Sequence, residues 1–144
     1  MKRFYLSVIA LSVLGIVGVG AQGDIESAAG VETGTIEDFE HLLEPSALLD
    51  FLAEPPAGFF LVDARTPAEY ADGHIPKSIQ IDYRDIGDQP PTDDRDALIV
   101  IYCQSGNRSG SAATILTQLG YTHVLNWGTI GNWPYEVVTG SDPE

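Results

Sequence analysis

The chain has 144 residues, of which 44% are hydrophobic, and its 21 acidic residues outnumber its 7 lysines and arginines to give a formal net charge of −14 at pH 7. So acidic a chain argues against nucleic acid as a partner. It also repels anionic ligands at long range, so any anion-binding site must be strongly positive locally.

The first 21 residues are typical of a cleavable secretory signal. Two basic residues precede an apolar run over 4–19, and small residues ending at Ala21 fit a cleavage site before Gln22. The run is shorter than the roughly 20 residues that a membrane span prefers. We therefore expect a periplasmic or secreted protein with no stable membrane insertion after cleavage; a retained anchor is the alternative. Removal of two basic residues leaves 5 basic against 21 acidic residues, a net charge near −16.

One domain is expected in the rest of the chain. About 120 residues follow the signal, which is enough for one hydrophobic core and too few for two. Residues 22–38 are rich in glycine, glutamate, serine and threonine and lack an apolar period, so we expect a flexible linker there. The domain is predicted over residues 39–141.

The first half of the domain is expected to alternate strands and helices. Residues 39–43 are predicted as a short edge strand, and Ser46 as the N-cap of a helix that reaches Leu52 and is ended by two prolines. The unbroken apolar run that ends at Asp63 indicates a buried strand. A short helix over 67–72 begins with proline.

The second half repeats this pattern. A turn leads to a brief strand over 78–81, and residues 82–96 are expected at the surface. The apolar run 98–102 predicts a second buried strand, and a helix is predicted over 109–119 with Gly120 as its stop. A last strand is predicted over 122–125, followed by a loop over 127–133 that enters a final helical piece.

This order predicts an α/β domain with a small parallel five-stranded sheet flanked by helices on both faces. Such sheets bind ligands beyond the carboxyl ends of their strands. Asp63 and Arg65 lie at the end of one strongly apolar strand, and the segment from Cys103 to Arg108 follows the other. We therefore expect the functional site at this edge of the sheet.

Cys103 is the only cysteine in the chain. Exported proteins usually pair their cysteines in disulfides, so a lone cysteine is either an inert buried residue or a chemically used thiol. Its place at a strand end, before polar, small and cationic residues, favours a used thiol. A loop that restarts as a helix leaves backbone N–H groups pointing inward, and with Arg108 these would form a cradle for a negative charge on sulfur.

Binding or structural roles are expected for the other polar and aromatic residues around these strands. Arg108 is expected to bind the anion, and the alternative is a surface arginine paired with an acid. Arg65 is expected to bridge Asp63 or Glu69 and so pin the strand end beneath the loop. His74 is expected as a turn residue bonded to the backbone, and Tyr121 and Trp133 are expected in the core.

Three sequence blocks, in this order and spacing, resemble the single-domain rhodaneses, which are sulfurtransferases. Together they span residues 62–133, about seven tenths of the predicted domain. The blocks are VDARTPAEY (62–70) with GHIP (73–76), CQSGNRS (103–109), and GY (120–121) with Val124 and GTIGNW (128–133).

The resemblance implies that Cys103 is a catalytic residue that becomes a persulfide. A small sulfur anion such as thiosulfate would be the donor and a thiol or cyanide the acceptor, with a redox protein as a further candidate acceptor. No metal or organic cofactor is implied, and the exported form is similar to bacterial periplasmic thiosulfate sulfurtransferases. The implied substrate-binding residues are Gln104, Ser105, Gly106, Asn107, Arg108 and Ser109, with backbone N–H groups around the persulfide and Gly106 allowing a close turn.

Two other functions stay open. The protein could be a persulfide carrier that delivers sulfur to a protein partner, or an arsenate reductase or phosphatase-like enzyme that uses the same anion cradle. Those phosphatases and reductases have five residues between the cysteine and the arginine, whereas four separate Cys103 from Arg108. The shorter loop suits a sulfane sulfur better than a tetrahedral phosphate.

Trp127 departs from the usual family pattern, in which the loop before the final helix commonly carries two adjacent glycines. Here the loop reads NWGT over 126–129. If Trp127 points into the mouth of the cradle, it would favour small donors over bulky ones. The alternative is that it packs against the last helix.

Overall fold

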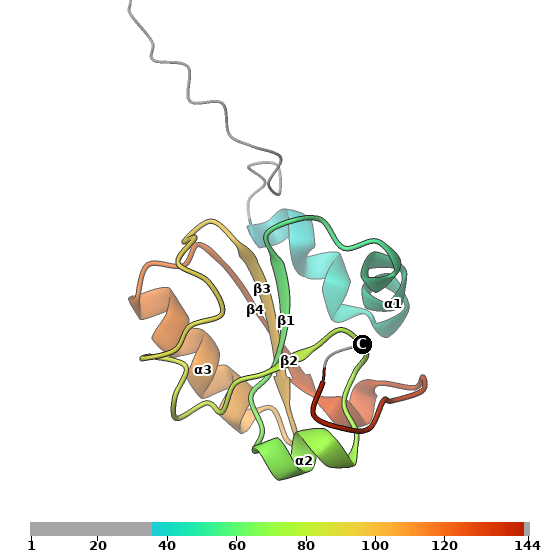
Figure 1. The fold of residues 1–144 in the computed structure, drawn as a ribbon. Coiled ribbons are helices and arrows are strands. Elements are labelled where there is room, and N and C mark those ends of the chain that lie inside the picture. The colour runs from blue at the N-terminus through green and yellow to red at the C-terminus, as the bar shows by residue number, and fades with distance from the viewer. Residues whose placement is uncertain (1–35, 143–144) are drawn as a thin grey trace, which may run out of the picture.

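The structure is a computed structural model that describes residues 36–142; the predicted signal peptide and residues 22–35 of the predicted linker lie outside the described residues. No helix in this part of the chain is long and apolar enough to cross a membrane. Figure 1 shows its elements, which in chain order are the 3-10 helix η1 (Ile36–Leu43), α1 (Pro45–Ala53), β1 (Phe59–Asp63), α2 (Pro67–Asp72), β2 (Ile79–Gln80), β3 (Leu98–Cys103), α3 (Asn107–Gln118), β4 (His123–Thr129) and the 3-10 helix η2 (Ile130–Asn132).

The described residues form one parallel sheet of four strands in the order β2-β1-β3-β4. The two unbroken apolar runs became the central strands β1 and β3, because strands in the middle of a covered parallel sheet are buried on both faces. The α/β class with a parallel sheet flanked by helices is thus confirmed, with four strands in place of five.

The predicted edge strand over 39–43 is wrong, because this segment belongs to the 3-10 helix η1. Phe39 and Leu42 are three residues apart, which places both on one side of a helix with three residues per turn. Leu42 is fully buried and Phe39 packs against the same cluster of core residues. Helix formation therefore buries Leu42 and partly buries Phe39 without a strand partner.

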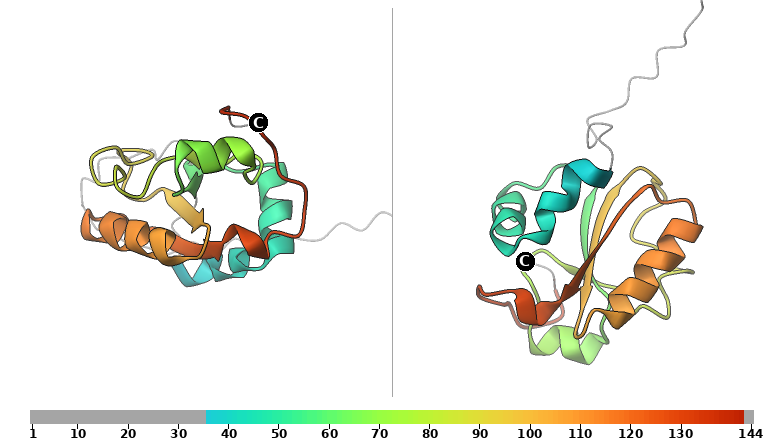
Figure 2. Two further views of the ribbon diagram at one scale, coloured as in Figure 1. Left: turned by 90° about the horizontal axis from the view of Figure 1, so that it is seen from below. Right: turned by 180° about the vertical axis from the view of Figure 1, so that it is seen from behind.

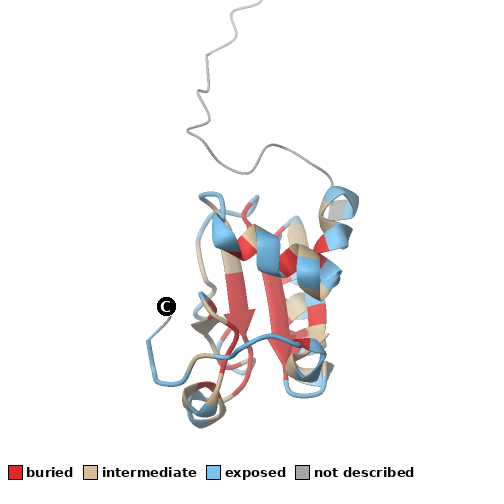
Figure 3. Cartoon of the chain, turned by 90° about the vertical axis from the view of Figure 1, so that its right-hand side faces the viewer, coloured by how far each residue is buried: buried red, intermediate tan, exposed pale blue. Residues whose placement is uncertain are grey.

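Helices cover both faces of the sheet (Figures 1 and 2): η1 and α1 lie on one face and α3 lies on the other. Successive residues of a strand point to opposite faces. Tyr102 accordingly packs with Leu48 and Leu52 of α1, whereas Cys103 packs with Ala112 and Leu116 of α3. The central strands β1 and β3 hold the most deeply buried stretches of the described residues (Figure 3).

Several predicted boundaries shift. Helix α1 begins at Pro45 after Glu44, which caps it without a side-chain hydrogen bond, so Ser46 is not its N-cap. Helix α3 begins at Asn107, two residues earlier than predicted, and the last strand continues to Thr129. Within the loop 82–96, expected at the surface, Ile86 is fully buried.

Candidate active site

The thiol of Cys103 lies where β3 ends and the chain turns into α3. Its side chain is a free cysteine and the residue is fully buried. The backbone N–H of Gly106 donates a hydrogen bond to Sγ, with 3.0 Å between nitrogen and sulfur. Helix α3 starts one residue later, so the sulfur lies at the end of a helix whose first N–H groups are positively polarised.

The surroundings of Cys103 favour its thiolate. Burial by itself raises the pKa of the thiol, but the hydroxyl of Ser109 and the backbone N–H groups of Ser109, Ser105 and Gly106 lower it, and the net pKa lies below the ordinary value of 9.0. Hydrogen bonds to the charged form have this effect because they stabilise the anion and not the neutral thiol. A buried cysteine that only packs has no such set of donors.

The end of β4 contacts one side of the loop 103–109, here called the cradle loop. Gly106 and Gly128 both have left-handed backbone angles, with φ of 90° and 97°, and a Cβ built on Gly106 would lie 3.6 Å from the Cα of Gly128. The hydroxyl of Ser109 lies within hydrogen-bond distance of the carbonyls of Gly106 and Gly128, at 3.0 and 3.3 Å, and can donate its one proton to either. Thr129 Oγ1 donates to the carbonyl of Gln104 at 2.6 Å. These contacts fix the turn around the sulfur.

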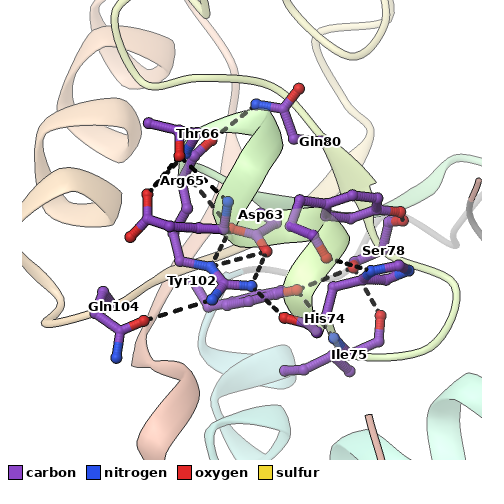
Figure 4. A network of polar contacts seen from close by, with 12 residues as sticks. Asp63, Arg65, Thr66, His74, Ile75, Ser78, Gln80, Tyr102 and Gln104 are labelled. Atoms are coloured by element: carbon purple, nitrogen blue, oxygen red, sulfur yellow. Dashed lines mark hydrogen bonds and ion pairs between the residues drawn. The ribbon is translucent and has the colours of Figure 1, made fainter. Parts of the chain in front are cut away.

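Arg65 joins the end of β1 to the same loop (Figure 4). Its guanidinium forms a buried ion pair with Asp63, with 2.6 Å between Nη2 and Oδ2. Burial lowers the pKa of Arg65, but Asp63, with smaller contributions from Tyr102 and Glu69, raises it, and the net shift is upward. Arg65 also donates to the carbonyl of Gly73 at 2.7 Å and, over 3.4 Å, to the side chain of Gln104. Of the two predicted acids the partner is Asp63, not Glu69.

A second group of hydrogen bonds holds the residue before the cysteine (Figure 4). The hydroxyl of Tyr102 accepts from the backbone N–H of Ile75 and is bonded to Ser78 Oγ, both over 3.0 Å. His74 is the predicted turn residue: its Nδ1 donates to the carbonyl of Tyr70 at 2.9 Å. The segment after α2 therefore anchors β3 one residue before Cys103.

Arg108 is bound to an acid across the site. Its two terminal nitrogens donate to the two carboxylate oxygens of Glu69, each over 2.8 Å. This pairing holds the pKa of Glu69 far below its usual range and raises that of Arg108. The guanidinium also interacts electrostatically with Cys103. The structure thus shows the alternative, an arginine paired with an acid, and anion binding by Arg108 stays a prediction.

Three of the other predicted loop residues lie at the surface. Gln104, Ser105 and Asn107 are exposed, whereas Ser109 is fully buried beneath the loop. Sequence reasoning missed the contacts of Glu69 and Thr129 with the loop. The spacing of Thr66 and Glu69 indicates a capping box. No local sequence pattern indicates that the Glu69 carboxylate also pairs with Arg108.

Trp127 lies on the other side of the sheet from Cys103, so it does not narrow the mouth of the cradle. The ring is 5% exposed and packs with the core between the sheet and η1, where Nε1–H donates to the carbonyl of Leu42 at 3.1 Å. The pairing of β3 and β4 shifts at this point, from Ile101 opposite Asn126 to Tyr102 opposite Gly128. This bulge leaves Trp127 without a partner residue on β3. The interpretation as packing therefore holds.

We expect Trp127→Ala to destabilise the fold by about 3–5 kcal/mol, the usual cost of deleting a buried tryptophan ring. Chemical denaturation would measure the change. Trp127→Phe is the control, because it retains a packed ring and loses the hydrogen bond, for about 1 kcal/mol. Below the unfolding transition, small and bulky sulfur donors should react with Trp127→Ala in the same ratio as with the wild type. A selective increase in activity with bulky donors would show that Trp127 does limit access to Cys103.

These features define an α/β domain with a cysteine of lowered pKa at the carboxyl edge of a parallel sheet. The family model described as the rhodanese-like domain matches residues 44–129, more than half of the chain. The chain belongs to this family.

Relatives and solved structures agree with this assignment. Thiosulfate sulfurtransferase PspE of Escherichia coli K12 is 35% identical over 69 residues, which are 46% of this chain and 66% of that protein, just under two thirds. Thiosulfate sulfurtransferase GlpE of Pseudomonas syringae is 36% identical over 90 residues, 58% of this chain and 83% of that protein. The structure of a rhodanese with anions from E. coli is 31% identical, with a TM-score of 0.50 over 57% of this chain and 99% of that one.

Proposed function

We propose that the protein is a thiosulfate sulfurtransferase that carries sulfane sulfur as a persulfide on Cys103. The observation that carries this proposal is the set of hydrogen-bond donors that lowers the pKa of one thiol at the carboxyl edge of the sheet. The names of two relatives in the same family support the reaction class. Donors arranged in this way would stabilise the anion of a persulfide as they do that of the thiol.

The cycle has two displacements at sulfur. The Cys103 thiolate attacks the outer sulfur of thiosulfate, so a new S–S bond forms, the bond to the sulfonate sulfur breaks, and sulfite leaves with the electron pair. An acceptor such as cyanide or a thiolate then attacks the terminal sulfur of the persulfide. The Cys103 thiolate leaves, which restores the resting enzyme. No net oxidation or reduction of the protein takes place.

Access to the sulfur requires a local movement in this proposal. Cys103 is fully buried, while the neighbouring Gln104 and Ser105 are exposed. The short segment 104–106 is thus the part of the cradle that can open toward solvent with the least loss of packing. The hydrogen bond from Gly106 N–H to Sγ would then pass to the terminal sulfur of the persulfide.

Intact-mass measurement of the protein after treatment with thiosulfate tests the proposal. One added sulfur, about 32 Da, is expected on a chain with a single cysteine, and it should disappear on addition of cyanide with release of thiocyanate. A persulfide that discharges only onto a protein would favour the carrier function. No added sulfur would contradict both.

We also propose that the protein is exported, on the basis of the signal-like N-terminus. The mature chain should then begin near Gln22 and be recovered from the periplasm or the medium. N-terminal sequencing of fractionated cells measures this. A full-length chain found only in membranes would contradict the proposal.

A further inference from the structure

Two arginines lie at the loop 103–109, and each forms an ion pair with a carboxylate. Arg65 is paired with buried Asp63, and Arg108 is paired with Glu69. The side chains around Cys103 therefore contribute little net positive charge, in a chain whose overall charge is strongly negative. This arrangement is unexpected for a site that has to attract a dianion.

Hydrogen bonds at the start of α2 orient Glu69 independently of its pair with Arg108. It is the third residue of α2, where its Oε2 accepts from the backbone N–H of Thr66 at 3.0 Å and from Thr66 Oγ1 at 2.8 Å. The same carboxylate accepts both hydrogen bonds from Arg108. A carboxylate with this many donors stays ionised and keeps one orientation, as its strongly lowered pKa indicates.

Arg108 retains hydrogen-bonding capacity in this pair. A guanidinium has five N–H donors, and the two bonds to Glu69 use only one from each terminal nitrogen. The Nε–H and one hydrogen on each terminal nitrogen remain, and the side chain is partly exposed. Arg108 can thus bind an anion while it stays paired, but with much of its charge offset by Glu69.

We infer that Glu69 is a positioning residue that orients Arg108 and sets the charge of the donor site, so that the site discriminates against donors of higher negative charge. The inference rests on the proposed sulfur transfer and adds a determinant of donor specificity to it. Glu69 would weaken the attraction for a dianion such as thiosulfate more than for a monoanionic donor, because its repulsion scales with the charge of the donor. The same repulsion would ease the release of sulfite.

The variant Glu69→Gln tests this inference, because glutamine at this position of a helix also completes a capping box. Activity is measured with thiosulfate, a dianion, and with methanethiosulfonate, a monoanion that also carries a sulfane sulfur. We expect the ratio of the two kcat/KM values to shift toward thiosulfate by about three- to tenfold, the order expected for removal of one nearby charge close to the protein surface. The gain should lie in KM.

Asp72→Asn is the matched control, since it removes one negative charge from the other end of the same helix. This variant should leave the donor ratio unchanged. An unchanged ratio in Glu69→Gln, or an equal loss with both donors, would overturn the inference and leave Glu69 as a residue that only stabilises α2.

A second measurement does not depend on sulfur transfer. The pH dependence of alkylation by iodoacetamide reports the pKa of Cys103, since the chain has one cysteine. Loss of the Glu69 charge should shift this pKa to lower pH, because a nearby negative charge opposes ionisation of the thiol. If the wild type transfers no sulfur but the shift occurs, the proposed reaction fails while the electrostatic role of Glu69 stands; no shift would overturn that role.

Discussion

Replacement of Cys103 with serine is expected to abolish sulfur transfer and to leave the fold intact. A serine hydroxyl forms no persulfide, and its oxygen is not ionised at neutral pH, so neither displacement can take place. The side chain is nearly the same size, and a hydroxyl oxygen can accept the hydrogen bond that the N–H of Gly106 now donates to sulfur. Thiocyanate formation from thiosulfate and cyanide measures the reaction, and thermal unfolding measures the fold.

A comparison with Cys103→Ala separates loss of the reactive sulfur from loss of the acceptor for the Gly106 N–H. Alanine leaves the Gly106 N–H without its partner, so it should lower stability more than serine does while being equally inactive. Turnover above the uncatalysed rate in either variant would refute Cys103 as the nucleophile.

Replacement of Arg108 with alanine is expected to reduce kcat/KM for thiosulfate by about 10- to 150-fold, which corresponds to the loss of roughly 1.5–3 kcal/mol from a charged hydrogen bond. The pKa of the thiol should rise at the same time, because the guanidinium interacts with Cys103. The pH below which activity declines would therefore move upward. Steady-state kinetics over a range of pH measures both effects.

Arg95→Ala is the control for the loss of an arginine. Arg95 stacks on the ring of Tyr121, 4.3 Å from its centroid, and precedes β3, at the opposite edge of the sheet from Cys103. Its removal should not change kcat/KM.

The pair with Glu69 adds a test of coupling. In Arg108→Ala an uncompensated Glu69 would repel the donor, so the same change should cost less in a Glu69→Gln background. Unchanged kinetics in Arg108→Ala would place this arginine among the surface ion pairs.

The sequence alone was sufficient to predict the two central strands and the position of the site. The apolar runs before Asp63 and Cys103 are unbroken because both faces of these strands are covered, a signal that does not depend on distant residues. Because parallel strands end at the same edge, the residues that follow them had to meet there. The lone cysteine at that edge then indicated the chemistry.

Contacts between distant segments decided the remaining features. The segment 39–43 is apolar enough for a strand, and it became helical because Leu42 could pack against the sheet and accept the hydrogen bond of Trp127. The side on which Trp127 lies stayed open because the last strand was predicted to end at Leu125. Since β4 continues to Thr129, Trp127 points to the same face of the sheet as Leu125, two residues earlier. Arg108 and Glu69 are 39 positions apart. Their pairing exists only because β1 and β3 are neighbours, so that α2 and α3 begin at the same edge of the sheet.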